Sequence, residues 1–220
     1  MSAKQKLISQ QIADQLRDKI HRGQLLPGTP LNLVALREEL GVSISPVRDA
    51  TKLLEREGYV QVVPRRGVFV RQVELEEILE AYDFRLAIEP VMVELAAPHI
   101  SEAQIKKLQE NYRSLFTIEG GSASEAFRAM DMALHLTVTK HCPNRIFKSM
   151  ISSIVGYIEW SSGYALRNMP DSLPNTVEEH LKVCDALLRR DIAAAAEAMR
   201  QHLLATRARI TTYMGVSASK

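Results

Sequence analysis

Residues 40–60 read LGVSISPVRDATKLLEREGYV, and their pattern indicates how the first part of the chain folds. Gly41 occupies the position at which a glycine usually ends a helix. Ser43 and Pro46 suit the start of a second helix, which favours a hydroxyl cap and an early proline. Gly58 then ends that helix. Two helices joined by a glycine turn predict a helix-turn-helix.

The flanking residues extend this motif on both sides. Apolar residues recur every four positions over residues 8–20, which predicts an amphipathic helix. A shorter helix is expected over residues 34–40, with Asn32 or a neighbour as its cap. After Gly58, β-branched and aromatic runs flank the turn PRRG at residues 64–67, which predicts a hairpin. Residues 1–72 are therefore expected to form a winged helix-turn-helix domain.

The remainder of the chain carries helical patterns and no further strand signal. A linker is expected at residues 73–75, followed by a long helical register that Pro98 closes. Several more helical segments follow, so residues 76–214 are expected to form an all-α bundle of about six helices. Residues 215–220 are expected to be a frayed tail. The fold class is mostly α.

Charge is divided unevenly along the 220 residues. Residues 1–72 hold 12 Lys and Arg against 7 Asp and Glu, a net charge of +5, whereas the remainder has a net charge of −3. This asymmetry indicates a first domain that faces nucleic acid. No apolar run approaches the roughly 20 residues that cross a bilayer, and no secretory signal is present, so a cytoplasmic protein is expected.

The second helix of a helix-turn-helix enters the major groove, where its first residues reach bases and phosphates. Arg48 is the leading candidate for such a contact, either with guanine or with a phosphate. The wing tip, with two arginines before a glycine, suits a phosphate or minor-groove contact. The predicted DNA-binding residues are Ser43, Ser45, Arg48, Lys52, Arg65, Arg66 and Gly67, and Thr51 lies among them.

These motifs together resemble the winged-helix domain of GntR-type bacterial transcription regulators over nearly all of residues 8–71. The resemblance rests on PGTPLN, LGVSISPVRDATKLLEREGYV and PRRGVFV. It implies a homodimer that binds double-stranded operator DNA. Family members usually have arginines at the positions of Val34 and Ile44, so the resemblance does not imply which operator sequence is bound.

A possible metal site lies in the second part of the chain. Asp131 and His135 are four residues apart, so a helix places both on one face, together with apolar residues. His180 and His202 each lie within an apolar stripe farther along. Three imidazoles and a carboxylate can bind a divalent transition metal. Each histidine taken alone is more often an ordinary hydrogen-bonded core or surface residue than a metal ligand.

The segments DMALH, EHLKVCDALLRRD and MRQHL, with YDFRLAIEPVMVELAA before them, resemble the FCD ligand-binding domain of the FadR subgroup of GntR regulators. The resemblance implies a divalent metal held by Asp131, His135, His180 and His202, with zinc first and nickel, manganese or cobalt as alternatives. It also implies a small carboxylate effector. Arg85 is the candidate charge partner of this acid, with a salt bridge to Glu89 as the alternative.

The sequence thus predicts a repressor, and not an enzyme, whose operator affinity is controlled by a small carboxylate at a metal site. Two alternatives remain open: a metal-dependent enzyme acting on small organic acids, and a regulator whose metal is purely structural. The enzyme is disfavoured because no general base lies beside the four ligands. Glu179 adjoins His180, but a helix turns it roughly 100° away. Asn144 is expected to cap a helix.

Overall fold

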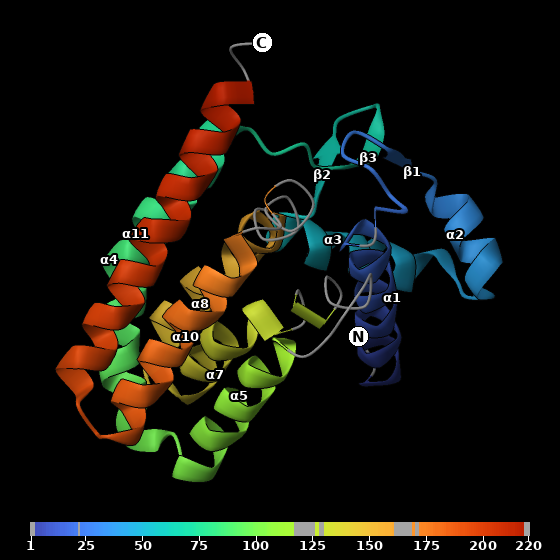
Figure 1. The fold of residues 1–220 in the computed structure, drawn as a ribbon. Coiled ribbons are helices and arrows are strands. Elements are labelled where there is room, and N and C mark those ends of the chain that lie inside the picture. Colours follow the sequence, from blue (N-terminus) through green and yellow to red (C-terminus); the bar gives the residue numbers. More distant parts are fainter. Residues whose placement is uncertain are drawn as a thin grey trace. The chain divides into compact units, whose positions relative to one another are not determined.

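The computed structural model describes residues 3–21, 23–116, 126–127, 130–160, 169 and 172–217 (Figure 1). The chain forms two compact units. The first consists of Met1–Glu74 together with Ser152–Trp160, and the second consists of Leu75–Ile151 and Ser161–Lys220. The predicted linker at residues 73–75 lies at this division. The grouping of Ser152–Trp160 with the first unit was not predicted.

The helices of the first unit follow the predicted order: α1 (Ala3–His21), α2 (Leu33–Leu40) and α3 (Ile44–Arg56). The Asn32 side chain caps α2 by accepting hydrogen bonds from the backbone N–H groups of Val34 and Ala35. Gly41 ends α2 in the left-handed conformation, with φ of 62°, which glycine adopts at little cost. Ser43 is the N-cap residue of α3, as predicted, but its hydroxyl makes no capping hydrogen bond.

The wing is a small antiparallel sheet. Strands β2 (Val60–Val63) and β3 (Gly67–Val70) form the predicted hairpin, and β1 (Pro30–Leu31) adds to the other edge of β3 to give the order β1-β3-β2. The sequence did not predict β1, because two residues are too short to show the alternation of a strand.

Apolar side chains from the helices and the wing close one core in the first unit. α1 packs against α3, and three side chains of α3, those of Val47, Ala50 and Leu54, are completely buried. Val60 and Val70 from the wing join them. This packing fixes which face of α3 stays exposed, and thereby which residues can meet DNA.

The second unit is helical throughout the part that the structure describes. Its helices are α4 (Leu75–Ala96), α5 (Glu102–Leu115), α7 (Ala133–His141), α8 (Arg145–Ser153, which crosses into the first unit), α10 (Leu173–Leu188) and α11 (Ile192–Ser217). α4 and α11 lie side by side (Figure 1), and α10 packs on both α11 and α5. The mostly helical fold class is therefore confirmed.

The ends of these helices follow local chemistry. Pro98 lies in a short 3₁₀ turn, Ala97–His99, directly after α4, as predicted. The Asn144 side chain accepts hydrogen bonds from two N–H groups at the start of α8, which confirms its capping role. Residues 215–217 of the predicted tail belong to α11, and residues 218–220 lie outside the described part of the chain. Among the described helices, none is both long and apolar enough to cross a membrane.

Candidate metal centre and DNA-binding surface

The predicted DNA-contacting residues lie on exposed parts of the first unit. Ser43, Ser45, Arg48 and Lys52 are exposed along the start of α3. Thr51 is the exception, because it is buried and its hydroxyl donates to the backbone carbonyl of Arg48, 2.9 Å away. Thr51 therefore belongs to the core and cannot reach DNA without unfolding of the helix.

The wing tip presents its arginines differently. Arg65 has a φ of 63°, in the left-handed region that is uncommon for residues other than glycine. The guanidinium of Arg66 lies over the Phe69 ring, 5.8 Å from its centre. Arg65, Arg66 and Gly67 are all exposed. Val34, where related regulators usually have arginine, is half exposed and apolar.

Three histidines from three helices meet inside the second unit. His135 comes from α7, His180 from α10 and His202 from α11, and all three are buried. One nitrogen of each ring lies within 4.8 Å of the others. The Nε2 atoms of His180 and His202 are 3.2 Å apart. The structure thus brings together the three imidazoles that the sequence could only propose as neighbours.

Carboxylates hold the outer nitrogens of two of these rings. The Glu89 carboxylate lies 2.5 Å from Nδ1 of His135, and the Glu179 carboxylate lies 2.9 Å from Nδ1 of His202. A carboxylate at one ring nitrogen fixes the tautomer and turns the other nitrogen toward a shared point, as occurs around protein-bound metals. The side chain of Arg209 holds Glu179 in turn, with nitrogen to oxygen distances of 2.7 and 2.9 Å.

Arg85 belongs to the same buried cluster. Its guanidinium forms a salt bridge with Glu89 at 2.5 Å, so the structure contains the ion pair that the sequence offers as the alternative to effector binding. The guanidinium also lies 3.2 Å from Nδ1 of His135. An arginine in this place can present positive charge close to the imidazoles while Glu89 balances it.

Burial and neighbouring charges set the protonation of the cluster. Burial lowers the pKa of His180 and of His202, and in His202 it outweighs the opposite effect of Glu179. Burial alone would raise the pKa of Glu179, but Arg209 and His202 lower it to about 2. Glu89 is likewise held below its usual pKa, against the effect of burial, by Arg85 and His135. The cluster therefore combines ionised outer carboxylates with neutral His180 and His202 rings, the state that can bind a metal.

The buried His180 ring has an unpaired nitrogen. Among buried side-chain nitrogen and oxygen atoms of the described residues, Nδ1 of His180 has no hydrogen-bond partner. Leaving such an atom unpaired costs free energy. A ring with one unpaired nitrogen, next to two other imidazoles, fits a site that holds an ion.

Asp131 does not join the three imidazoles in one compact group of ligand atoms. It is half buried, one turn before His135, and its charge acts on Arg85 and Tyr112. The chain makes a turn at Met132 before α7 begins at Ala133, so the continuous helix expected through Asp131 and His135 is interrupted there.

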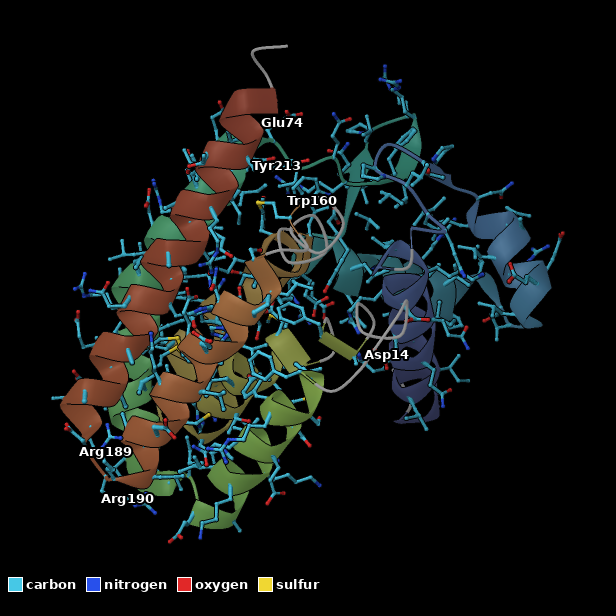
Figure 2. The ribbon with its side chains drawn as sticks, in the orientation of Figure 1. Asp14, Glu74, Trp160, Arg189, Arg190 and Tyr213 are labelled. Atoms are coloured by element: carbon cyan, nitrogen blue, oxygen red, sulfur yellow. The ribbon has the colours of Figure 1, made fainter. Side chains whose placement is uncertain are left out.

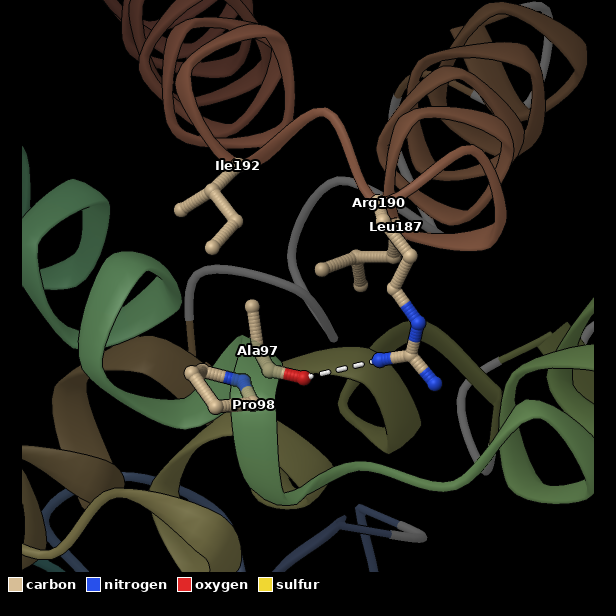
Figure 3. Close-up of a pocket in the computed structure, with 5 residues that line it drawn as sticks. All are labelled: Ala97, Pro98, Leu187, Arg190 and Ile192. Carbon is tan, nitrogen blue, oxygen red and sulfur yellow. Dashed lines mark hydrogen bonds between the residues drawn. The ribbon is translucent and has the colours of Figure 1, made fainter.

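A small pocket lies elsewhere in the second unit, beside the turn that joins α10 to α11. It is lined by Ala97, Pro98, Leu187, Arg190 and Ile192 (Figure 3). Arg189 and Arg190 lie in that turn (Figure 2). The Arg190 guanidinium donates to the carbonyl of Ala97 at 3.1 Å and also to that of Ile100. Because this arginine is engaged with backbone carbonyls and the other lining residues are apolar, the pocket is a weak candidate for an acid.

The sequence did not predict two features of the histidine cluster. Glu179 was expected to point away from the site because it adjoins His180 on one helix, yet it contacts a histidine of another helix, His202. The contact of Arg209, on α11, with Glu179 is the second unpredicted feature. A helical period reports which face a residue occupies but not which neighbouring helix that face meets.

Both parts of the chain match known protein families. Residues 8–70 match the family described as bacterial regulatory proteins, gntR family, and residues 80–205 match the FCD domain. The chain is 28% identical over 199 residues to the HTH-type transcriptional repressor RspR of Escherichia coli, covering 89% of this chain and 86% of that protein. It is 26% identical over 200 residues to the HTH-type transcriptional regulator YdhC of Bacillus subtilis, covering 89% and 85%.

The solved structure of E. coli McbR/YncC has the same fold. It superposes with a TM-score of 0.76 at 22% identity, covering 93% of this chain and 97% of that one. At this identity the likeness concerns the fold alone. The matched families and curated relatives are transcription regulators, so the enzymatic alternative is set aside.

The buried ion pair gives a first test. Replacing Glu89 by Gln leaves the Arg85 charge buried without its carboxylate, which typically costs about 3 kcal/mol or more. We expect Glu89→Gln to lower the free energy of unfolding of the metal-free protein by about that amount, measured by urea titration. Asp83→Asn is the matched control, because Asp83 pairs with Arg207 at the exposed surface of the same helix, where such a pair contributes about 0.5 kcal/mol. Equal, small losses in both variants would contradict this account.

Proposed function

This chain belongs to the gntR family of bacterial regulatory proteins and is a transcriptional regulator with an FCD domain, and we propose that it is a homodimeric repressor whose operator affinity responds to a small carboxylate at a divalent metal. The observation that carries the proposal is the convergence of His135, His180 and His202, all buried, at one place in the second unit.

The proposed DNA interface consists of the exposed start of α3 and the wing tip. Arg48 is exposed one turn into α3, and Ser45 lies three residues before it, on the same face. Arg65 and Arg66 extend the positive charge along the wing. A single winged helix contacts few base pairs, so two copies on a two-fold symmetric operator give the specificity that regulation requires.

The proposed metal ligands are the three imidazoles, with Asp131 as the proposed fourth ligand. A divalent ion there would supply a Lewis-acidic centre that accepts a carboxylate oxygen. A set of nitrogen and oxygen ligands can bind zinc, nickel, manganese or cobalt. Zinc is the first choice because imidazole nitrogens are common zinc ligands. Glu89 and Glu179 would hold the rings of His135 and His202 in position from behind.

The proposed effector is a small carboxylate that reaches the metal and the Arg85 guanidinium. Arg85 is buried beside His135 and carries a fork of donors that matches a carboxylate. An acid that binds one arrangement of the dimer more tightly shifts the dimer toward that arrangement and so changes its affinity for the operator. By linkage, operator DNA changes the affinity for the acid by the same factor. The deep burial of the histidines also suits a purely structural metal. Binding of a small acid to the metal-loaded protein distinguishes an effector-binding metal from a structural one.

Arg48→Ala tests the DNA interface. Loss of a guanidinium that contacts a base or a phosphate costs about 1 to 3 kcal/mol, so we expect operator affinity to fall roughly 5-fold to 150-fold by gel shift at fixed salt. Arg56→Ala, at the opposite, exposed end of α3, is the matched control and should bind within about twofold of wild type. Unchanged affinity of Arg48→Ala would refute the assigned recognition surface.

His180→Ala tests the metal. The purified wild-type protein should hold one divalent ion per chain by elemental analysis, and His180→Ala should hold less than a tenth of that after dialysis against dilute chelator. His99→Ala, which removes an exposed histidine, should keep the full content. Full metal content in His180→Ala would remove this residue from the site.

A panel of small acids tests the effector. We expect at least one member of a set of sugar acids, hydroxy acids and dicarboxylates to raise the melting temperature of the zinc-loaded protein, because a ligand of the folded state stabilises it. Arg85→Lys keeps the charge opposite Glu89 but loses the fork, so it should weaken acid binding about tenfold by calorimetry while the metal remains. If the metal stabilises the fold and no acid binds, the metal is structural and the effector proposal fails.

A further inference from the structure

The hydroxyl of Tyr112 lies between two backbone groups of the segment that carries Asp131 and His135. Tyr112 comes from α5 and is completely buried. Its hydroxyl donates to the carbonyl of Met130 at 3.1 Å and accepts from the N–H of Leu134 at 3.2 Å. These two backbone groups are four residues apart, so they are the pair that bonds directly in a continuous α-helix. The tyrosine hydroxyl therefore takes the place of one helical hydrogen bond.

This insertion accounts for the interruption of the helix at Met132. A side chain that enters the series of i to i−4 hydrogen bonds is one of the recognised causes of a break in a helix. The sequence from Met130 to His141 contains neither proline nor glycine, which are the other frequent causes. Directly after the turn, the N–H of Leu136 donates to the carbonyl of Met132 at 2.9 Å. The regular pattern therefore resumes at once, and the interruption is local.

The ring of Tyr112 contacts a second part of the metal centre. Its centre lies 5.0 Å from the centre of the His180 ring, and the two planes are tilted by 34°. This spacing is within the range at which aromatic rings pack favourably. One residue of α5 therefore touches His180 of α10 through its ring and the backbone on both sides of Asp131 through its hydroxyl.

The hydroxyl keeps the proton that this bonding needs. Burial raises the pKa of Tyr112 well above its usual value, and the neighbouring Cys184 and Asp131 add to the effect. The protonated hydroxyl can donate to one backbone group while its oxygen accepts from the other. Leu134 is completely buried, and a buried N–H without a partner costs free energy. The contact therefore completes the backbone hydrogen bonding at the interruption.

The inserted hydroxyl sets the backbone offset between two proposed metal ligands. Asp131 lies before the interruption and His135 after it. A direct N–H···O bond would be about 2.9 Å long, whereas the inserted oxygen separates the two groups by bonds of 3.1 and 3.2 Å. In a regular helix, residues four apart lie nearly in line. The position of Asp131 relative to His135 therefore depends on a side chain of another helix.

We propose that Tyr112 is a positioning residue of the metal centre. Its hydroxyl holds the helix open at the offset that the Asp131 carboxylate needs to reach an ion held by the three imidazoles, and its ring supports His180. The proposal rests on the proposed function, because it needs a divalent metal at these residues. Without the hydroxyl, the direct backbone bond can form and move Asp131 relative to His135. Loss of a residue that orients metal ligands typically weakens metal binding by about 10-fold to 100-fold.

Tyr112→Phe is the direct test, because phenylalanine keeps the ring beside His180 and removes only the hydroxyl. Thr137→Val is the matched control, since it removes a hydroxyl of α7 that donates to the carbonyl of Ala133 at 2.8 Å. We expect Tyr112→Phe to weaken zinc binding at least about tenfold, measured by competition with a chromogenic chelator. Thr137→Val should stay within about twofold of the wild type. The same small change in both variants would overturn the proposal.

A double-mutant cycle shows whether Tyr112 acts through Asp131. Two side chains that act as a unit have non-additive effects. The loss of zinc affinity caused by Tyr112→Phe should therefore shrink to less than about twofold in an Asp131→Ala background. A general weakening of the fold would lower the affinity equally in both backgrounds, and that result would overturn the proposal. Unchanged zinc affinity in Asp131→Ala alone would also overturn it.

A measurement on the metal-free protein separates failure of this proposal from failure of the proposed function. The hydroxyl proton of Tyr112 should give an NMR cross-peak with the amide proton of Leu134, because both protons lie at the same oxygen. Absence of this cross-peak in the wild type would overturn the inserted hydroxyl even if zinc binds. If the wild type shows the cross-peak but binds no zinc, the proposed metal function fails, and the positioning role fails with it.

Discussion

Three buried imidazole rings, with one nitrogen of each lying within 4.8 Å of the others, impose the main constraint on the second unit. A buried ring nitrogen needs a partner, and a buried charge needs a counter-charge. The carboxylates of Glu89 and Glu179 meet this need at the outer nitrogens of two rings. Because these groups come from α4, α7, α10 and α11, the relative register of four helices must be maintained for the cluster to exist.

This arrangement is compatible with the proposed sensing function of the bundle. The inner nitrogens of His180 and His202 face each other at 3.2 Å, and the unpaired nitrogen of His180 shows that protein groups alone do not satisfy the cluster. An ion joined to all three rings would link three helices, and an acid joined to that ion would act on the same helices. Arg85, which contacts both Glu89 and His135, lies where such an acid would change the balance of charge.

Local chemistry made most of the fold predictable, and tertiary contacts account for what was not. Asn32 and Gly41 predict the two ends of α2, because capping depends only on residues within three or four positions of the helix end. The histidines were found through motifs, whereas their convergence and the role of Glu179 depend on which helices pack together. The grouping of Ser152–Trp160 with the winged-helix unit left no local signal in the sequence. Strand β1 exists through its pairing with β3.

X-ray absorption at the zinc edge of the purified, zinc-loaded protein can show whether the three histidines bind one ion, because it counts the ligands and identifies them. Zinc bound by histidine has nitrogen neighbours at about 2.0 to 2.1 Å and shows the scattering of the imidazole rings. We expect three imidazoles, with oxygen completing the set, at one zinc per chain. Sulfur ligation, or a zinc ion with fewer than two imidazoles, would contradict it.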